Sequence, residues 1–264
     1  MTNRRNFLAA IGAAGLSQPA ARGAASEPVK LIAHRGGVVD QRHPENSVGA
    51  AEEAIRRGYW MLEIDLQESK DGRLVVQHDD FGKSYGVAKW PRDLTWDETR
   101  KLRALTDGSR PLEFHEYAAV CKHRIQLMID TKEPSHSGPF YESMERTLRV
   151  NGLLDGAYFI GTTEARAYFK GKSRISVDRT ELKQKMAAGE DSARLYFLFE
   201  HGTTLDGEAL ALAKRAGVPA VVSINDFHYA GQDHMKAAHA DIERLRRAGL
   251  TYFQIDSMYD IWLR

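Results

Sequence analysis

The feature that most constrains the fold is a regular alternation of apolar, β-branched runs with helical patterns from residue 29 onward. Eight such runs predict strands, at 29–34, 60–66, 125–131, 156–161, 174–178, 195–200, 219–225 and 252–256. Between them, capping residues and terminal glycines predict helices, at 46–57, 95–105, 112–122, 139–150, 163–170, 180–188, 206–216 and 235–248. This α/β order predicts a closed (β/α)8 barrel, although an open doubly wound sheet accommodates the same alternation.

In such a barrel, functional residues lie on the loops that follow the carboxyl ends of the strands. Polar side chains gather at these ends in the sequence, namely His34, Glu63, Asp65, Asp130, Lys132, Glu200, Asn225 and Asp256. No glycine-rich nucleotide-binding fingerprint follows any of the predicted strands, which counts against an open nucleotide-binding sheet. Neither an internal repeat nor an interdomain linker is visible, so residues 27–264 are expected to form a single domain.

The predicted strand 60–66 carries two acids at alternate positions. Glu63 and Asp65 alternate with apolar residues, so in a strand both carboxylates project from one face. Two adjacent acids repel each other unless a positive charge lies between them, and a divalent cation bound through oxygen is a common solution. The alternative is that both acids form the solvent-facing side of a half-exposed strand.

A second strand follows after only a short connection, in the sequence KDGRLVVQHD at 70–79. Because parallel neighbours need a crossover of roughly a dozen residues, this connection must be an antiparallel hairpin. With Asp71-Gly72 as a two-residue turn, paired positions sum to 143 (70 + 73), which would place His78 opposite Asp65. We therefore expect a short β-hairpin above the barrel mouth that brings an imidazole to the acids.

At these residues the chain resembles the glycerophosphodiester phosphodiesterase family. The resemblance is carried, in order and spacing, by His34-Arg35-Gly36, Pro44-Glu45-Asn46, Glu63-x-Asp65, Lys70-Asp71-Gly72 and His78-Asp79. It continues more weakly through Asp130-x-Lys132 to Asp256, so that it covers roughly residues 29 to 260. The resemblance implies a TIM barrel and a metal-dependent hydrolase that cleaves glycerophosphodiesters to an alcohol and glycerol 3-phosphate.

The resemblance implies a metal site formed by Glu63, Asp65 and Asp130. Ligands that are all hard oxygens, without cysteine, favour Mg²⁺ or Ca²⁺, and Mn²⁺ and Zn²⁺ are left open. His34 and His78 are the expected acid–base pair, because phosphodiester cleavage removes one proton from the attacking oxygen and delivers another to the leaving oxygen. Imidazole titrates in the range that this exchange requires.

Four further residues are assigned to substrate binding. Arg35 and Lys132 supply positive charge for the phosphate oxygens, and salt bridges to neighbouring acids are the alternative. Glu45 can contact metal or substrate, or only hold Arg35. Asn225, at the end of the 219–225 strand, completes the set. Of the remaining histidines, those near strand ends are left open as pocket-lining residues, namely His201 and His228.

Two departures from the family pattern affect the substrate. The family usually has Glu-x-Lys where this chain has Asp130-Thr131-Lys132, and Asp-x-Lys is similar to the spider-venom sphingomyelinase D relatives. The strand end at 223–225 lacks the tryptophan that is common in the family. A phospholipase D-like cleavage of lysolipids or sphingolipids is therefore one alternative function, and a non-catalytic periplasmic binding protein is another.

Residues 1–26 differ in kind from the rest. Arg4-Arg5 precede the apolar run LAAIGAAGL and then small residues at 21–25, a layout typical of a cleavable export signal, and the paired arginines resemble a twin-arginine signal. A disordered basic terminus or an uncleaved anchor are the alternatives. The run is shorter than the roughly 20 residues of a membrane span. We expect a periplasmic or secreted protein without a stable membrane span in its mature form.

Charge and cysteine content limit the partners. Lys and Arg number 37 against 36 for Asp and Glu, so there is no basic excess to bind nucleic acid. Cys121 is the single cysteine, which rules out an intramolecular disulfide and is expected to be a buried structural thiol. The expected partner is a small-molecule or lipid-derived phosphodiester, and the oligomeric state is left open.

Overall fold

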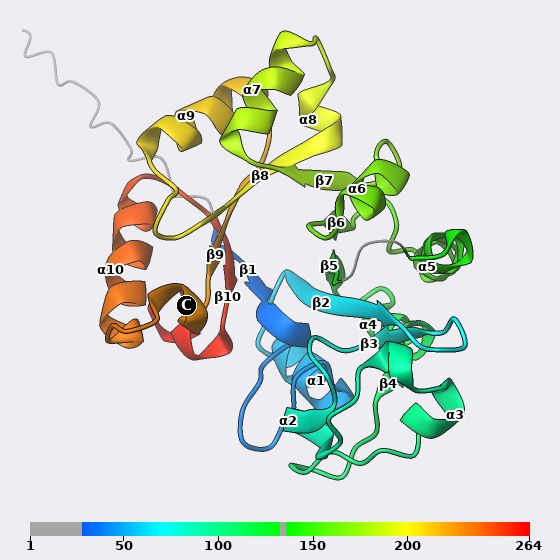
Figure 1. The fold of residues 1–264 in the computed structure, drawn as a ribbon. Coiled ribbons are helices and arrows are strands. Elements are labelled where there is room, and N and C mark those ends of the chain that lie inside the picture. The colour runs from blue at the N-terminus through cyan, green and yellow to red at the C-terminus, as the bar shows by residue number, and fades with distance from the viewer. Residues whose placement is uncertain (1–27, 133–135) are drawn as a thin grey trace, which may run out of the picture.

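Eight parallel strands close into a barrel surrounded by helices (Figure 1). The computed structural model describes residues 28–132 and 136–264, and the predicted export signal lies outside this part of the chain. The barrel strands are β1 (Lys30–Ala33), β2 (Met61–Glu68), β5 (Gln126–Thr131), β6 (Tyr158–Phe159), β7 (Arg174–Val177), β8 (Tyr196–His201), β9 (Ala220–Ile224) and β10 (Tyr252–Ile255). Because β1 pairs in parallel with both β10 and β2, the sheet has no open edge and the barrel is confirmed over the open alternative.

The helices form an outer layer around this sheet (Figure 1). They are α1 (Val48–Arg56), α2 (Gly82–Tyr85), α3 (Trp96–Thr99), α4 (Phe114–Cys121), α5 (Gly138–Val150), α6 (Thr163–Phe169), α7 (Arg179–Ala187), α8 (Ser192–Leu195), α9 (Gly207–Ala216) and α10 (His234–Arg247), with short 3-10 turns η1 (His34–Gly36), η2 (Pro91–Asp93), η3 (Asp226–Tyr229) and η4 (Ser257–Trp262). Side-chain caps begin many of them, as where Asp178 accepts from the backbone N–H groups of Thr180 and Glu181. Among the described helices, none has the length and apolar character needed to cross a membrane.

The barrel interior explains why polar residues gather at one end. Inward-facing side chains from six strands form a buried apolar cluster of Ile32, Met61, Met128, Tyr158, Phe197 and Val221. Since alternate residues of a strand share a face, the next inward positions on β2 and β5 are Glu63 and Asp130, and His34 follows directly after β1. An apolar floor thus lies beneath a polar layer at the carboxyl ends of the strands.

Two predicted helices need correction. The helix expected at 95–105 is the single turn α3. The Thr95–Glu98 capping box starts it, but the backbone N–H groups of Ala104 and Leu105 donate to Ser109 and Ser84 rather than within a helix. The helix expected at 112–122 begins at Phe114, since Leu112–Glu113 forms strand β4. Strand β4 pairs antiparallel with β3 (Leu74–Val76), and β3 pairs antiparallel with β2. The predicted hairpin of β2 and β3 is therefore extended by a third strand.

The hairpin is confirmed, but its predicted register is wrong by one residue. Leu66 pairs with Val76, a sum of 142 (66 + 76) rather than 143. Side chains lengthen the turn to three residues, 70–72: the Ser69 hydroxyl donates to Asp71 and accepts from the backbone N–H of Arg73. His78 therefore lies beyond the end of β3 and is not the ladder partner of Asp65.

Candidate active site

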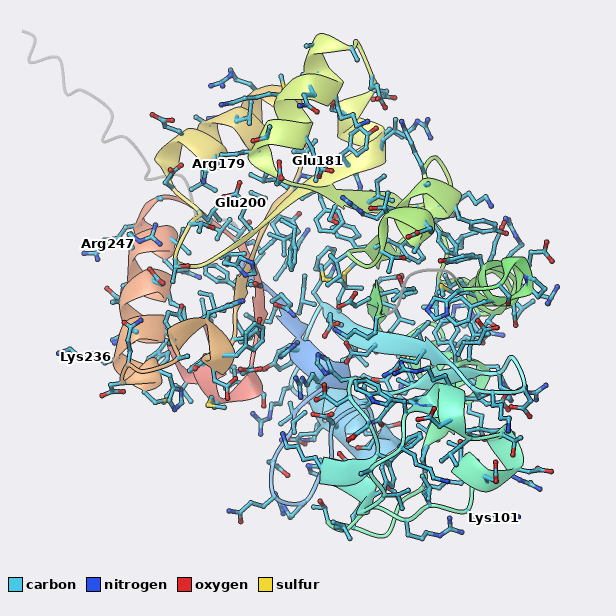
Figure 2. All side chains as sticks on the ribbon, viewed as in Figure 1. Lys101, Arg179, Glu181, Glu200, Lys236 and Arg247 are labelled. Atoms are coloured by element: carbon cyan, nitrogen blue, oxygen red, sulfur yellow. The ribbon has the colours of Figure 1, made fainter. Side chains whose placement is uncertain are left out.

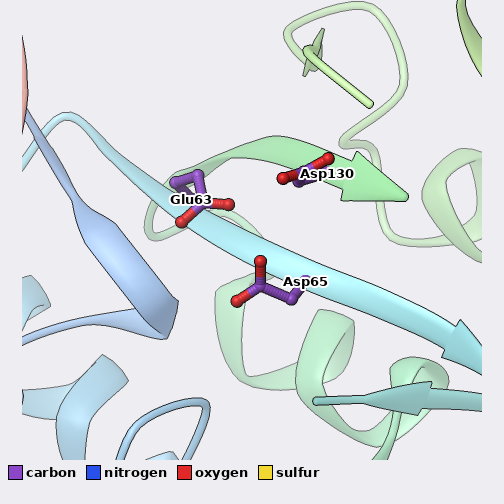
Figure 3. Close-up of side chains that lie close together, drawn as sticks. All are labelled: Glu63, Asp65 and Asp130. Atoms are coloured by element: carbon purple, nitrogen blue, oxygen red, sulfur yellow. The ribbon is translucent and has the colours of Figure 1, made fainter. Parts of the chain in front are cut away.

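Three carboxylates from neighbouring strands converge at the barrel mouth (Figure 3). Glu63, Asp65 and Asp130 each offer an oxygen such that all three oxygens lie within 4.8 Å of one another. Their closeness follows from the parallel register of β2 and β5, which pairs Asp65 directly with Asp130. Glu63 and Asp65 are 1% and 0% exposed, so the alternative of a solvent-facing strand surface is wrong.

Positive charge within this cluster comes mainly from Lys132. Its ammonium nitrogen lies 2.8 Å from Asp65 Oδ1 and 2.5 Å from Asp130 Oδ2. Burial opposes its charge, yet the carboxylates of Asp65 and Asp130 raise the pKa of Lys132 above its ordinary value. One lysine supplies too little positive charge for all three buried carboxyl groups to ionise together, and a bound cation would favour the charged form of each.

The carboxyl groups differ in how readily they ionise. Burial and the charge of Asp65 raise the pKa of Glu63 to about 8. Burial also raises the pKa of Asp130, although Lys132 opposes the shift. Burial disfavours the charged form of Asp65 too, but the charges of Lys132 and His78 hold its pKa below the ordinary value. This set of oxygen donors from two rigid strands fits a hard divalent cation.

His34 lies at the seam where the first and last barrel strands meet. Its Nδ1 lies 2.6 Å from Asp256 Oδ1, and its Nε2 lies 4.0 Å from Glu63 Oε2. Burial would lower the pKa of His34, but the bond to Asp256 and the charge of Glu63 raise it above the ordinary value. A carboxylate on Nδ1 fixes the ring orientation and leaves Nε2 as the atom that faces the acids.

Both the backbone N–H and the side chain of Arg35 contact acidic residues of the site. Its φ of +51° lies in the left-handed region, and its backbone N–H donates to Glu63 Oε2 over 2.9 Å. Its Nη1 donates to Glu45 Oε2 over 2.8 Å. Of the three roles considered for Glu45, the structure displays the one that holds Arg35, and a contact to metal or substrate stays a prediction.

A close approach of two loops supports this corner. A Cβ atom on Gly36, whose φ is +79°, would lie 2.7 Å from Asn46 Cα, so glycine is required there. Asn46 itself has a φ of +56° and donates through its side chain to Asp65 Oδ2 over 3.2 Å. The sequence did not predict this contact, although the place of Asn46 in the Pro44-Glu45-Asn46 motif was an available signal.

His78 lies at the site although the predicted hairpin register was wrong by one residue. The Gln67 side-chain amide donates to the His78 carbonyl oxygen over 2.8 Å and holds the bend that follows β3. The His78 Nδ1 lies 2.8 Å from Asp79 Oδ1, and its Nε2 lies 3.4 Å from Arg35 Nη2. The imidazole is therefore next to the phosphate-binding candidate Arg35, and close enough to the acids to influence the pKa of Asp65.

Asn225 and Asp256 form a supporting pair. The Asn225 side-chain amide lies 3.4 Å from Asp256 Oδ1, and the backbone N–H of Asp226 donates to Asp256 Oδ2 over 2.7 Å. Asn225 is 1% exposed, so the structure shows it orienting Asp256, and its contact with substrate stays a prediction. Sequence reasoning placed Asp256 at the mouth but gave it no role; its position after the last strand was the signal.

An aromatic wall lies beside His34 and was not predicted as such. The Phe227 ring, in a residue that is 56% exposed, has its centroid 6.1 Å from that of His34. His228 packs against Phe227 at 4.3 Å and against His201 at 4.2 Å. Burial and the charges of His201 and His34 lower the pKa of His228 to about 4. Both histidines that the sequence left open thus lie in one ring cluster near the mouth.

The comparisons with known proteins agree with this fold and site. The family model described as "Glycerophosphoryl diester phosphodiesterase family" matches residues 34–253, which shows that the chain belongs to this family. The human protein named glycerophosphodiester phosphodiesterase 1 is 29% identical over 118 residues, 41% of this chain and 35% of that protein. The protein named glycerophosphodiester phosphodiesterase from Caldanaerobacter subterraneus is 38% identical over 76 residues, 28% of this chain and 30% of that protein. These matches span less than half of the relatives' length.

Solved structures extend the likeness of fold to nearly the whole chain. The structure of an Oleispira antarctica phosphodiesterase in complex with the product sn-glycerol-3-phosphate superposes with a TM-score of 0.69 at 18% identity. That match covers 89% of this chain and 94% of the other. The predicted family and the predicted barrel are both confirmed.

Proposed function

We propose that the protein hydrolyses glycerophosphodiesters to an alcohol and glycerol 3-phosphate, with a divalent cation and two histidines. The observation that carries the proposal is the convergence of Glu63, Asp65 and Asp130 within 4.8 Å, flanked by His34 and by His78 beside Arg35. Family membership and the names of the relatives support the substrate class. The Mg²⁺ or Ca²⁺ expected from the ligand set would supply Lewis-acid stabilisation of the phosphate charge.

The residues of the chain itself would position the phosphate and move the protons. Arg35 offers a planar guanidinium held by Glu45, and Lys132 offers an ammonium for a non-bridging oxygen. One imidazole would take a proton from water or from a hydroxyl of the substrate, and the other would give a proton to the leaving oxygen. Asp256 keeps the Nε2 of His34 directed at this exchange.

The test measures release of glycerol 3-phosphate from glycerophosphocholine with and without EDTA, in the wild type and in His34→Ala. We expect EDTA to abolish turnover, and His34→Ala to reduce kcat by about 10²–10⁴-fold. His115→Ala, at a histidine whose side chain is 60% exposed, is the matched control. Equal, metal-independent rates in all samples would refute catalysis at this site and favour a non-catalytic binding protein.

A specific observation supports the phospholipase D-like alternative. The exposed Phe227 ring beside His34 offers an apolar surface at the edge of the site. The acyl chain of a lysolipid bound there could pack against this ring as it extends from the site toward solvent. Comparing turnover of glycerophosphocholine with that of lysophosphatidylcholine separates the two functions. Cleavage of the lysolipid alone would replace the first proposal by the second.

We also propose that residues 1–26 direct export through a twin-arginine route, which places the protein in the periplasm or outside the cell. The support is the Arg4-Arg5 pair before an apolar run in the sequence. Replacing both arginines by lysine should retain the protein in the cytoplasm, as measured by cell fractionation. Unchanged export would refute this route.

A further inference from the structure

A groove opens at the end of the barrel opposite the proposed catalytic centre. It is formed by α9 together with residues 218–220, which lead into β9, and residues 248–252, which lead from α10 into β10 (Figure 1). Because these segments reach the strands at their amino ends, the groove lies away from His34 and Asp256, which follow carboxyl ends. Its volume of about 700 Å³ falls within the range of pockets that hold small organic molecules, about 300–1,000 Å³.

The lining of the groove is mostly apolar. Leu210 on α9, Val218 before β9 and Leu250 before β10 provide its aliphatic surface. Thr251 and Tyr252 bring hydroxyl groups, and the Tyr252 hydroxyl already accepts a hydrogen bond from within the chain. Burial of polar groups without hydrogen-bond partners is unfavourable, whereas burial of hydrocarbon is favourable. The groove therefore suits an aliphatic chain better than a peptide or a sugar.

Positive charge gathers around this apolar lining. Lys214 lines the groove from the last turn of α9, and Arg246 and Arg247 end α10 directly before the lining residue Ala248. These three basic side chains are exposed, and none of them is paired with a carboxylate in the part of the chain that the structure describes. Arg247 donates only to the backbone carbonyl of Glu243, over 3.2 Å. The charge around the groove is thus left for a ligand.

Basic residues at helix ends often have a simpler cause, because they interact favourably with the helix dipole. The last turn of α5 shows the usual arrangement in this chain, where Arg149 also has an acid one turn earlier and donates to Glu145 over 2.6 Å. The corresponding positions before Lys214 are Leu210 and Ala211, which line the groove. An acid at either position would neutralise Lys214. The dipole therefore does not account for the pairing of apolar lining with unpaired charge.

A fourth cation is held by one of the lining residues. The Lys30 ammonium donates to the Tyr252 hydroxyl over 3.0 Å and lies 5.1 and 4.8 Å from the ring centroids of Trp60 and Tyr252. Aromatic faces attract a cation but do not cancel its charge. Positive charge near the groove therefore comes from three elements, α9, α10 and β1.

We propose that this groove binds an anionic amphiphile with a single hydrocarbon chain and a phosphate head group. The chain packs along Leu210, Val218 and Leu250, and the phosphate pairs with Lys214 and with the guanidinium groups at the end of α10, whose planar forks match phosphate oxygens. A flat bilayer fits less well, because the apolar residues are recessed: Val218 is 6% and Leu250 4% exposed. This binding does not depend on the proposed function at the barrel mouth.

The first test measures the affinity of dodecyl phosphate for the protein by isothermal titration calorimetry, below the concentration at which this amphiphile forms micelles. Inorganic phosphate and dodecyl maltoside are the comparison probes, since the first lacks the chain and the second lacks the charge. We expect dodecyl phosphate to bind at least about tenfold more tightly than either, because only this probe uses both the lining and the cations. Equal affinity for dodecyl phosphate and either comparison probe would overturn the inference.

The barrel mouth also offers a guanidinium to phosphate, so a second arm separates the two places. Arg35→Ala removes that group, and the affinity for dodecyl phosphate should be unchanged. A loss of affinity in this variant would place the amphiphile at the mouth and overturn the inference. Sedimentation of the protein with phosphatidylglycerol vesicles, without binding of dodecyl phosphate, would overturn it in favour of a bilayer.

The second test changes the groove itself. Ala211→Glu puts a carboxylate one turn before Lys214, at an exposed helical position where glutamate is a good helix former. We expect the affinity for dodecyl phosphate to fall about tenfold, since the new charge both neutralises Lys214 and enters the apolar lining. Lys214→Ala should lower the affinity about threefold, as one exposed charge pair is lost.

Ala240→Glu and Lys236→Ala are the matched controls, because both positions are exposed on α10 and neither lines the groove. Figure 2 labels Lys236 and Arg247 toward opposite ends of α10, and their separation in sequence corresponds to about 16 Å along the helix. Both controls should keep the wild-type affinity. Unchanged affinity in both Ala211→Glu and Lys214→Ala would overturn the inference. If Ala211→Glu unfolds in thermal melts, Lys214→Ala decides alone.

Discussion

Two groups of acids lie at the same end of the barrel and are stabilised in different ways. Glu200 is bound at both oxygens by the guanidinium of Arg179, which also donates to Asp206. Glu63, by contrast, accepts from the backbone N–H of Arg35, while the ammonium of Lys132 contacts its neighbours Asp65 and Asp130. A buried acid whose two oxygens are bound by a cation is paired within the chain, whereas a buried group of acids with too few cations favours a further positive charge.

The largest expected effect separates function from stability within the cluster that contains Glu63. Glu63→Gln keeps the volume of the side chain but replaces one oxygen of the proposed metal site by an amide nitrogen. On the proposed mechanism we expect kcat/KM to fall on the order of a thousandfold, because the cation would supply several kcal/mol of transition-state stabilisation. The thermal unfolding midpoint in EDTA should not fall. Activity within tenfold of the wild type would move Glu63 out of the metal site.

An effect of intermediate size, on stability, is expected at Glu200, the acid bound by Arg179. Glu200→Gln leaves the half-buried Arg179 without its strongest partner, so the free energy of unfolding should fall by about 1–3 kcal/mol. Urea denaturation measures it, with the exposed Glu208→Gln on α9 as control. Unchanged stability in Glu200→Gln would mean that the pairing with Arg179 does not stabilise the fold. Glu200 would then not differ in this respect from the acids of the proposed metal site.

The smallest effect concerns a carboxylate outside the mouth. Hydrogen bonds from Lys172 and then Arg149 lower the pKa of Glu145 to about 2. A lowered folded-state pKa stabilises the protein above the unfolded value of 4.5, and this contribution is lost as the pH falls from there toward 2. Because these partners are solvent-screened, Glu145→Gln should reduce the free energy of unfolding by less than about 1 kcal/mol at pH 7.

The difference between this variant and the wild type should nearly vanish at pH 2 in denaturant titrations, where Glu145 is protonated in the unfolded state and about half protonated in the folded state. A difference that persists undiminished at pH 2 would show that packing rather than charge causes it.

The barrel was predictable because its signals are local and repeated. All eight barrel strands fall within the ranges expected from β-branched runs, with residue 201 added to β8 and residues 67–68 to β2. The alternation of acidic and apolar residues along β2 is sufficient by itself to place Glu63 and Asp65 on one face. The prediction of a helix over 95–105 was wrong beyond the first turn, since the backbone N–H groups of Ala104 and Leu105 bond to Ser109 and to Ser84, contacts that a local pattern does not reveal.

Specific side-chain contacts, within the hairpin turn and between distant segments, could not be predicted from the sequence. The hairpin register depended on the Ser69 and Asp71 side chains, which lengthened the turn by one residue. The role of Asp256 depended on its pairing with His34 across 222 positions of sequence. A polar residue at a strand end is visible in the sequence, but which of several such residues it will bond is a property of the closed barrel.

The His34–Asp256 bond joins the first strand of the barrel to the last. Because the two residues are 222 positions apart in the sequence, this orientation of the imidazole forms only when the two ends of the domain meet, and contacts of such long range are slow to form. Enzymatic turnover would therefore be an unusually strict reporter of ring completion during refolding, later to recover than any spectroscopic measure of helix content.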